Sequence, residues 1–331
     1  MDTTHLVDPE LLDTLQQLPP LQLTPEALPV VREQLAAAPP PPLPDGVTEE
    51  EVFVPREGKD PVRVLVHRPA GTAHDAPGLL WIHGGGYLIG SPDADRAQTG
   101  TYAQLLGAVV VSVDYGLSPE NVAPGPVEDC YAALRWLHDH ADDLGVDRSR
   151  LAVGGASAGG GLAACLALLA RDRGEVPLVL QFLVYPMLDD RTVTAPDPNP
   201  TVGQFIWTPE FNAFGWRSLL GGEPGADGVS PYAAAARAED LAGLPPTFLE
   251  VGSLDLFLEE DVEYARRLTR AGVPTELHVY PGAFHGYQMV VDAEVTRTSF
   301  QLGTSALRRA LRPGDGETPR QDAAGRATVT G

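Results

Sequence analysis

An alternation of short apolar runs with longer amphipathic stretches, between about residues 50 and 312, constrains the fold more than any other feature of this sequence. The apolar runs predicted as strands are residues 52–56, 62–68, 79–83, 108–115, 151–154, 178–185, 247–251 and 275–280. Stretches with helical spacing, such as 126–140, 158–173 and 259–271, separate the later runs. Parallel neighbours need such crossover helices, whereas the first two runs have none between them and are expected to be antiparallel. The pattern predicts an α/β fold with a mostly parallel eight-stranded sheet flanked by helices.

Three segments flank or interrupt this alternation. Residues 1–45 contain two short helical patterns, each opened by a proline suited to a first turn, and a proline run at 39–44. Residues 187–240 are rich in proline, aspartate and aromatic side chains, and an insertion of this length is typical of a lid or binding element. Residues 313–331 are small and polar and are predicted to form a flexible tail.

The charge balance excludes two classes of partner. The 331 residues include 45 acidic and 23 basic side chains, which gives a formal net charge of −22, and Lys59 is the only lysine. Binding to nucleic acid or to an anionic membrane requires clustered basic residues, whereas the arginines of this chain are scattered. The acidic balance also disfavours anionic substrates, so we expect a neutral or cationic one.

Cysteine content and apolar segments predict the compartment. The N-terminus has no basic region followed by an apolar run, as a secretory signal would have. No run approaches the ~18–20 apolar residues of a membrane span. The two cysteines, Cys130 and Cys165, cannot build a disulfide framework and do not have the spacing of metal ligands. We therefore expect a reduced, cytoplasmic protein without membrane insertion.

The strongest local motif surrounds Ser157. The residues Gly155-Ala156-Ser157-Ala158-Gly159 lie between an apolar run and a helical stretch rich in alanine and leucine. A G-x-S-x-G pattern at a strand-to-helix turn is typical of a serine nucleophile, because the strained turn projects the oxygen over the sheet edge and small neighbours prevent clashes. The helix N-terminus favours developing negative charge. A glycine-rich turn could equally bind a phosphate, so this motif alone leaves both readings open.

A second motif, His83-Gly84-Gly85-Gly86, directly follows the apolar run at 79–82. Consecutive glycines leave backbone N–H groups bare and able to approach a substrate oxygen closely. An acyl-transfer enzyme needs such donors to hold its tetrahedral oxyanion. Glycine runs are also found in loops that are merely flexible. For His83 itself, a structural role in fixing the loop is favoured over a catalytic one.

An acid and a histidine follow in a suitable order. Asp255 comes just after the run at 247–251, and His285 comes just after the run at 275–280. Sites in open α/β sheets form at the carboxyl ends of strands. The order serine, aspartate, histidine is the one found in α/β hydrolases. Asp255 and His285 are therefore the candidates for the acid and the base.

Together these motifs resemble the hormone-sensitive-lipase-like branch of the α/β hydrolases, which contains many bacterial esterases. The resemblance covers about residues 50–312 and includes Asp114-Tyr115, Ser118-Pro119-Glu120, Val229-Ser230-Pro231-Tyr232 and His285-Gly286-Tyr287. It implies a core sheet with helices on both faces and a helical cap. The chain then divides into N-terminal helices that contribute to the cap (1–45), a first part of the core (46–186), a cap insertion (187–240), a second part of the core (241–312) and the flexible tail (313–331).

The resemblance also implies the chemistry. Ser157, His285 and Asp255 would form the triad of a serine carboxylesterase that hydrolyses short to medium acyl esters through an acyl-enzyme, without a metal or an organic cofactor. The N–H groups expected to bind the oxyanion belong to Gly84, Gly85, Gly86 and Ala158. The side chains expected to line an apolar substrate pocket are Leu88, Phe205, Trp207, Phe211, Phe214 and Tyr287.

The chain departs from the family pattern at four positions. The family usually has Asp or Thr at the position of Ala156, Arg at that of Gly116, Asn at that of Gly161 and Pro at that of Leu256. None of these changes removes a member of the expected triad.

Two rival functions remain open on the sequence alone. One is a non-catalytic small-molecule receptor on the same scaffold, similar to the plant hormone receptors of this superfamily. Those receptors lack a competent histidine, whereas this chain keeps the serine, the acid and the histidine. The other rival is an amidase, deacetylase or biosynthetic acyl-transfer enzyme with the same triad. The physiological ester, its stereochemistry and the formation of a homodimer are left open.

Overall fold

The computed structural model describes residues 2–18, 22–72 and 74–312. These residues form one eight-stranded sheet, as the sequence predicts, with the strand order β1-β2-β4-β3-β5-β6-β7-β8. The strands are β1 (Val47–Arg56), β2 (Lys59–Pro69), β3 (Ala76–Ile82), β4 (Val109–Asp114), β5 (Val146–Ala156), β6 (Leu180–Val184), β7 (Thr247–Gly252) and β8 (Thr275–Tyr280). The tail predicted at 313–331 lies outside the described residues.

The pairing of the strands confirms the predicted mixture of directions. β1 pairs with β2, and β2 with β4, in antiparallel register, whereas all pairs from β4 to β8 are parallel. Several strands are longer than their apolar runs. β5 begins at Val146, five residues before the run predicted at 151–154, and includes the polar residues 147–150. Apolar runs mark only the part of a strand that is buried on both faces.

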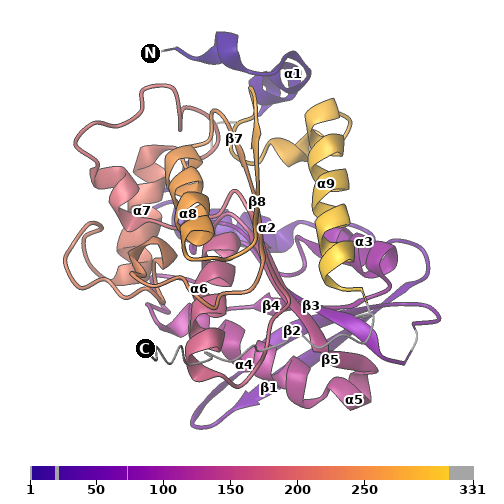
Figure 1. The fold of residues 1–331 in the computed structure, drawn as a ribbon. Helices are drawn as coiled ribbons and strands as arrows, with labels where there is room; N and C mark the ends of the chain where they lie inside the picture. Colours follow the sequence, from indigo (N-terminus) through magenta and orange to yellow (C-terminus); the bar gives the residue numbers. More distant parts are fainter. Residues whose placement is uncertain (1, 19–21, 73, 313–331) are drawn as a thin grey trace, which may run out of the picture.

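Helices cover both faces of the sheet (Figure 1). The α-helices are α1 (Pro9–Gln17), α2 (Leu28–Ala37), α3 (Arg96–Leu106), α4 (Gly125–Asp139), α5 (Ala141–Leu144), α6 (Ala158–Arg173), α7 (Pro209–Leu220), α8 (Leu258–Arg270) and α9 (Glu294–Ala310). Short 3₁₀ helices are η1 (Thr4–Leu6), η2 (Asp190–Thr194), η3 (Ala235–Arg237) and η4 (Tyr287–Met289). α3 and α9 pack on one face, and α4, α6 and α8 pack on the other.

Alternating side chains of the central strands build a core on each face. In β3, Leu80 and Ile82 join the cluster that includes residues of α4, α6 and α8. Leu79 and Trp81 point the opposite way, into the cluster with α3 and α9. Successive side chains of a strand face opposite sides, so a strand apolar at every position must be covered twice. This confirms the predicted α/β fold with helices on both faces.

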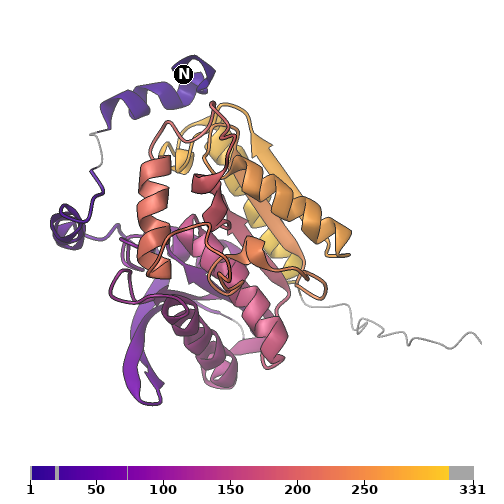
Figure 2. The ribbon, with the colours of Figure 1, turned by 90° about the vertical axis from the view of Figure 1, so that its left-hand side faces the viewer.

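The N-terminal segment lies across the outside of the sheet's carboxyl end (Figure 2). The N–H of Asp8 donates to the carbonyl of Gly282, at 3.0 Å, in the loop after β8. The carboxylate of Glu10 accepts from the N–H of Glu294, the first residue of α9. Leu11 of α1 is fully buried. The segment is thereby joined to the chain that follows the last strand.

The state of the cysteines and the character of the helices can be given for the described residues. Cys130 in α4 and Cys165 in α6 are both buried and free. Within residues 2–18, 22–72 and 74–312, no helix combines the length and the apolar character needed to span a bilayer.

Candidate active site

Ser157 lies at the sharp turn between β5 and α6. Its backbone has φ 58° and ψ −123°, a strained conformation for a residue with a side chain. A Cβ on Gly155 would lie 2.4 Å from the carbonyl oxygen of Gly159, and one on Gly159 would lie 2.1 Å from that of Ile82. The turn therefore forms only with glycine at both positions, which explains the G-x-S-x-G spacing.

A continuous row of hydrogen bonds joins Ser157, His285 and Asp255. The Oγ of Ser157 lies 2.9 Å from Nε2 of His285, and Nδ1 of His285 lies 2.8 Å from Oδ2 of Asp255. The second oxygen of Asp255 accepts from the N–H of Phe257 at 3.0 Å. Asp255 is fully buried, and Ser157 and His285 are each 6% exposed. With the Nδ1 proton held by the carboxylate, Nε2 is free to accept the serine proton.

Three aromatic rings surround the imidazole of His285. The ring of Tyr185 meets it edge-on with centroids 4.8 Å apart, and that of Phe257 does so at 5.1 Å. The indole of Trp207 lies at 6.2 Å. Contacts from several sides restrict the rotation of the ring, so the imidazole is held in the plane that reaches both partners.

The glycine loop runs beside Ser157. A Cβ on Gly84 would lie 3.4 Å from the Cβ of Ser157. Gly85 and Gly86 have φ values of +114° and +62°, which residues with side chains adopt only with strain. A Cβ on Gly85 would lie 2.0 Å from the carbonyl oxygen of Ile89. Among the hydrogen bonds of the described residues, none uses the N–H groups of Gly84, Gly85, Gly86 or Ala158.

His83 and Arg32 hold this loop from outside the row of hydrogen bonds. His83 is buried, its Nδ1 lies 2.8 Å from the carbonyl oxygen of Gly84, and its ring stacks on that of Tyr115 at 4.3 Å. Burial lowers the pKa of His83, so it is neutral. Arg32 of α2 donates from Nε to the carbonyl of Leu88, at 2.8 Å, and from Nη2 to that of Ser118, at 2.6 Å. The predicted role of His83 as a loop-fixing residue fits this geometry.

The aromatic residues expected in the pocket separate into two groups. Trp207 covers the glycine loop: a Cβ on Gly86 would lie 2.0 Å from its Cη2, and its Nε1 donates to the buried Asn212 at 3.1 Å. The ring of Phe211 lies 6.1 Å from that of Trp207. Phe205, which lies 6.1 Å from the ring of Phe284, and Phe214 are partly buried against the two cores. Leu88 and Tyr287 are fully buried and offer no surface to a substrate.

The structure shows what surrounds three of the positions that depart from the family pattern. A Cβ on Gly161 would lie 2.1 Å from the carbonyl oxygen of Met187, so no side chain fits there. A Cβ on Gly116 would lie 2.5 Å from Nδ2 of Asn121, which fills that space. Leu256 packs against Gly203 in the segment 187–240: a Cβ added to Gly203 would lie 2.8 Å from Cδ1 of Leu256.

Sequence reasoning missed several residues around the site. Tyr185 and Phe257 contact the imidazole, and Arg32 holds the glycine loop. The buried Glu250 and the half-buried Gln288 form a polar cluster behind His285. One signal was available: Glu250 is a charged residue inside an apolar run predicted as a strand. Charged residues are almost never fully buried unless they are paired, so its position alone indicates a special environment.

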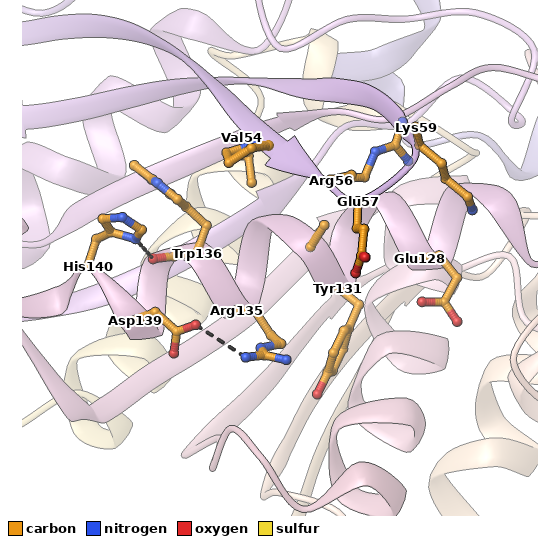
Figure 3. Close-up of a pocket in the computed structure, with 12 residues that line it drawn as sticks. Val54, Arg56, Glu57, Lys59, Glu128, Tyr131, Arg135, Trp136, Asp139 and His140 are labelled. Atoms are coloured by element: carbon orange, nitrogen blue, oxygen red, sulfur yellow. Dashed lines mark hydrogen bonds and ion pairs between the residues drawn. The ribbon is translucent and has the colours of Figure 1, made fainter.

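A separate groove lies at the far edge of the sheet (Figure 3). It has a volume of about 400 Å³ and lies between the end of β1 and α4. Two of its charged groups, Arg135 and Asp139, pair with each other at 3.4 Å. β2, β4 and β3 separate β1 from β5, the strand that leads to Ser157. Within the described ranges, no cluster of three or more His, Cys, Asp or Glu residues could hold a metal ion.

Comparisons with known proteins agree with this geometry. A family model described as the alpha/beta hydrolase fold matches residues 79–289. The carboxylesterase NlhH of Mycobacterium tuberculosis is 36% identical over 92% of this chain and 96% of its own length. Esterase LipI of the same species is 33% identical over 86% of this chain and 89% of its own. The solved structure of a bacterial heroin esterase has a TM-score of 0.88 and 42% identity, over 94% of this chain and 100% of that one. The chain belongs to the α/β-hydrolase fold family, in the hormone-sensitive-lipase-like branch that its motifs indicate.

Proposed function

We propose that this chain, a carboxylic ester hydrolase, cleaves short to medium acyl esters with Ser157 as nucleophile, His285 as base and Asp255 as the acid that orients it. The observation that carries the proposal is the hydrogen-bonded row from Asp255 through His285 to Ser157 beside four unbonded N–H groups. This combination of nucleophile, base, orienting acid and oxyanion donors is the set that acyl transfer needs.

Acylation begins when Ser157 attacks the ester carbonyl. Nε2 of His285, 2.9 Å from the serine oxygen, takes the proton as the new C–O bond forms. Asp255 stabilises the imidazolium through Nδ1–H. The imidazolium then gives its proton to the leaving alcohol as the C–O bond of the ester breaks, and the acyl group remains on Ser157.

The negative charge of the tetrahedral intermediate is stabilised by backbone N–H groups. Those of Gly85, Gly86 and Ala158 are the proposed donors, with Gly84 as a further candidate. These N–H groups are fixed in place before the substrate arrives, so the protein does not have to reorganise when the negative charge develops. The N-terminus of α6 adds its dipole in the same direction. Water, deprotonated by the same histidine, then releases the acid.

The proposed size limit of the substrate follows from Trp207. Its indole covers Gly86 and approaches His285, and the catalytic serine and histidine are almost buried. Together with Phe211 it leaves an apolar but confined approach to the serine. We therefore expect p-nitrophenyl acetate and butyrate to be hydrolysed faster than the palmitate. Faster cleavage of the palmitate would contradict the size limit.

The proposed cap consists of residues 1–45 and 187–240. Three contacts support it: Asp8 to Gly282, Arg32 to Leu88, and Trp207 to Gly86. Each joins one of these segments to a loop that carries a proposed site residue. The cap would thus shape the pocket and fix the loops together.

The decisive experiment replaces Ser157 by alanine. Hydrolysis of p-nitrophenyl acetate should fall by ~10³-fold or more, because the nucleophile and its base act as a unit, and labelling by a fluorophosphonate should be lost. Ser112→Ala, at a buried serine outside the site, is the matched control and should keep both. Absence of labelling in the wild type would instead favour a receptor.

A parallel panel of anilides tests whether amides are cleaved faster than esters.

A further inference from the structure

A buried glutamate lies in the strand that leads to the catalytic acid. Glu250, in β7, is 1% exposed. Its Oε1 accepts from Nε2 of Gln288 at 2.8 Å and from Oγ of Ser299 at 2.9 Å. Its Oε2 accepts from the hydroxyl of Tyr280 at 3.2 Å. Three donors from three different elements, η4, α9 and β8, therefore meet at one carboxylate.

Gln288 connects this carboxylate to the loop of the catalytic histidine. It lies in η4, three residues after His285. Its amide nitrogen donates to Glu250 and, at 2.9 Å, to Ser299, and its carbonyl oxygen accepts from the hydroxyl of Tyr185 at 3.3 Å. A glutamine amide has two donors and one acceptor oxygen, so both ends of this side chain are engaged. The turn after His285 is thereby tied to the sheet.

Tyr185 completes the connection to the imidazole. Its hydroxyl is bound by Gln288, and the edge of its ring packs against His285. Its backbone N–H donates to the carbonyl of Glu250 at 2.6 Å. Phe257 packs against His285 as well, also edge-on. The polar cluster thus fixes the position of the Tyr185 ring, and this ring restricts the positions that the imidazole can take.

The charge of Glu250 is isolated. Among the ion pairs of the described residues, none includes it. The titratable groups that face it are His278 and Tyr280 from β8, Tyr185 after β6, Tyr287 from η4 and Tyr102 from α3. Burial raises the pKa of Glu250 to about 7, against the opposing effect of its hydrogen bonds with Ser299 and Tyr280. Its protonation therefore changes in the neutral range, behind the catalytic base.

We propose that Glu250 and Gln288 are positioning residues that hold His285 in reach of Ser157 and Asp255, by fixing the turn after His285 and the Tyr185 ring that packs on it. This inference rests on the proposed function of His285 as base. Neither residue contacts the glycine loop or Trp207 in the described hydrogen bonds. Loss of the cluster should therefore lower kcat and leave KM nearly unchanged, because the imidazole moves while the pocket does not.

Gln288→Met is the main test, since methionine has a similar length and no amide. We expect kcat for p-nitrophenyl acetate to fall about 10- to 100-fold, in line with the cost of small misplacements of catalytic groups, with KM within twofold. The rate of fluorophosphonate labelling should fall by the same factor, and the low-field proton signal of the His285–Asp255 hydrogen bond should broaden. Gln181→Met is the matched control: it removes another buried glutamine hydrogen bond, to Thr247, and should lower stability without changing kcat.

Glu250→Gln tests the same cluster without depending on Gln288→Met folding. Glutamine can still accept from Gln288 and can donate to the Tyr280 hydroxyl, so kcat at pH 8 should stay within about threefold of wild type. Ser299→Ala should lower kcat less than Gln288→Met.

The outcomes separate this inference from the proposed function. Wild-type kcat in folded Gln288→Met, or a loss of kcat in Glu250→Gln as large as that in Gln288→Met, would overturn the positioning role while hydrolysis still depended on Ser157. Retained hydrolysis in Ser157→Ala would instead overturn the proposed function itself.

Discussion

The two loops that face each other across Ser157 are fixed in opposite ways. The glycine loop after β3 is held by close backbone packing: added atoms at Gly85 or Gly86 would collide with Ile89 or Trp207. The loop after β8 is held by hydrogen bonds between side chains, from Gln288 to Glu250 and Ser299. One half of the site has no room for an extra methyl group, whereas the other depends on its polar groups being satisfied. The two halves should therefore respond differently to substitution.

The largest expected effect is on the glycine side. Gly86→Ala places a methyl group against the indole of Trp207 at a residue with φ +62°, and should lower kcat by about 10²- to 10³-fold, the cost of losing one oxyanion donor. Gly107→Ala is the matched control, because it has φ +60° and nothing within 4 Å of its added Cβ. It carries the same backbone strain without the collision.

The double variant Gly86→Ala with Trp207→Ala sharpens this prediction. If collision with the indole displaces the loop, removal of the indole should restore part of the lost kcat. No recovery in the double variant would show that backbone strain at residue 86, and not the collision with the indole, lowers kcat.

The next effect concerns stability on the histidine side. The pKa of Glu250 is raised from 4.5 to about 7, so the folded protein holds this proton more tightly than the unfolded chain. The contribution of Glu250 to stability is therefore highest below pH 4.5 and is lost as the pH rises through 7. The shift corresponds to about 3 kcal/mol. Relative to Glu250→Gln, the wild-type free energy of unfolding should decrease by up to this amount between pH 4.5 and 8, as measured by urea denaturation.

A parallel pH series on Gly107→Ala checks that comparison. This variant keeps Glu250 and should follow the wild-type pH dependence. If the free energy of unfolding of Glu250→Gln shows the same pH dependence, ionisation of the Glu250 carboxyl does not destabilise the folded protein as expected.

A smaller effect is expected where α2 supports the glycine loop. Arg32→Ala removes the hydrogen bonds to the carbonyls of Leu88 and Ser118. Hydrogen bonds from a charged group contribute about 1.5–3 kcal/mol when largely shielded, and Arg32 is partly exposed, so we expect kcat to fall about 3- to 10-fold. Arg32→Lys keeps the charge and should recover less than half of the loss, because an ammonium cannot reach both carbonyls in the fork geometry. Equal activity of all three proteins would contradict a supporting role.

The smallest effect is expected in the groove of Figure 3. Arg135→Gln breaks an exposed pair with Asp139, and such substitutions change stability by about 0.5 kcal/mol or less. Hydrolysis should stay within twofold of wild type. A large loss of hydrolysis would show that residues at the β1 edge contribute to the site. The contrast between the two loops would then not account for the whole site.

The sequence predicts the parts of the site that depend on local motifs. Ser157 needs a strand, a turn and a helix within a few residues, and His83 to Gly86 need only the end of one strand. Asp255 and His285 follow from the rule that strand ends meet at one edge. The eight strands could also be predicted, although the polar start of β5 could not, because its residues have no apolar alternation.

The supporting contacts could not be predicted in the same way. Glu250 and Ser299 are 49 positions apart, and Arg32 and Leu88 are 56 apart. Their meeting depends on how α9 packs on the sheet and how α2 crosses the loop, which no short pattern specifies. For the same reason the aromatic content of residues 187–240 did not distinguish Trp207, which covers Gly86, from Phe214, which packs against the core.

The contact between the two ends of the described chain has a consequence for synthesis. Glu10 accepts a hydrogen bond from Glu294, 284 positions later, and Asp8 binds the loop that carries His285. Domains fold as units during translation, which proceeds from the N-terminus. The first helix can therefore dock only after β8 and the start of α9 have been made, and the hydrogen-bonded row from Ser157 to Asp255 stays incomplete until His285, which follows β8, has left the ribosome. With His285 as the proposed base, the order of the segments prevents acyl transfer by a partly made chain.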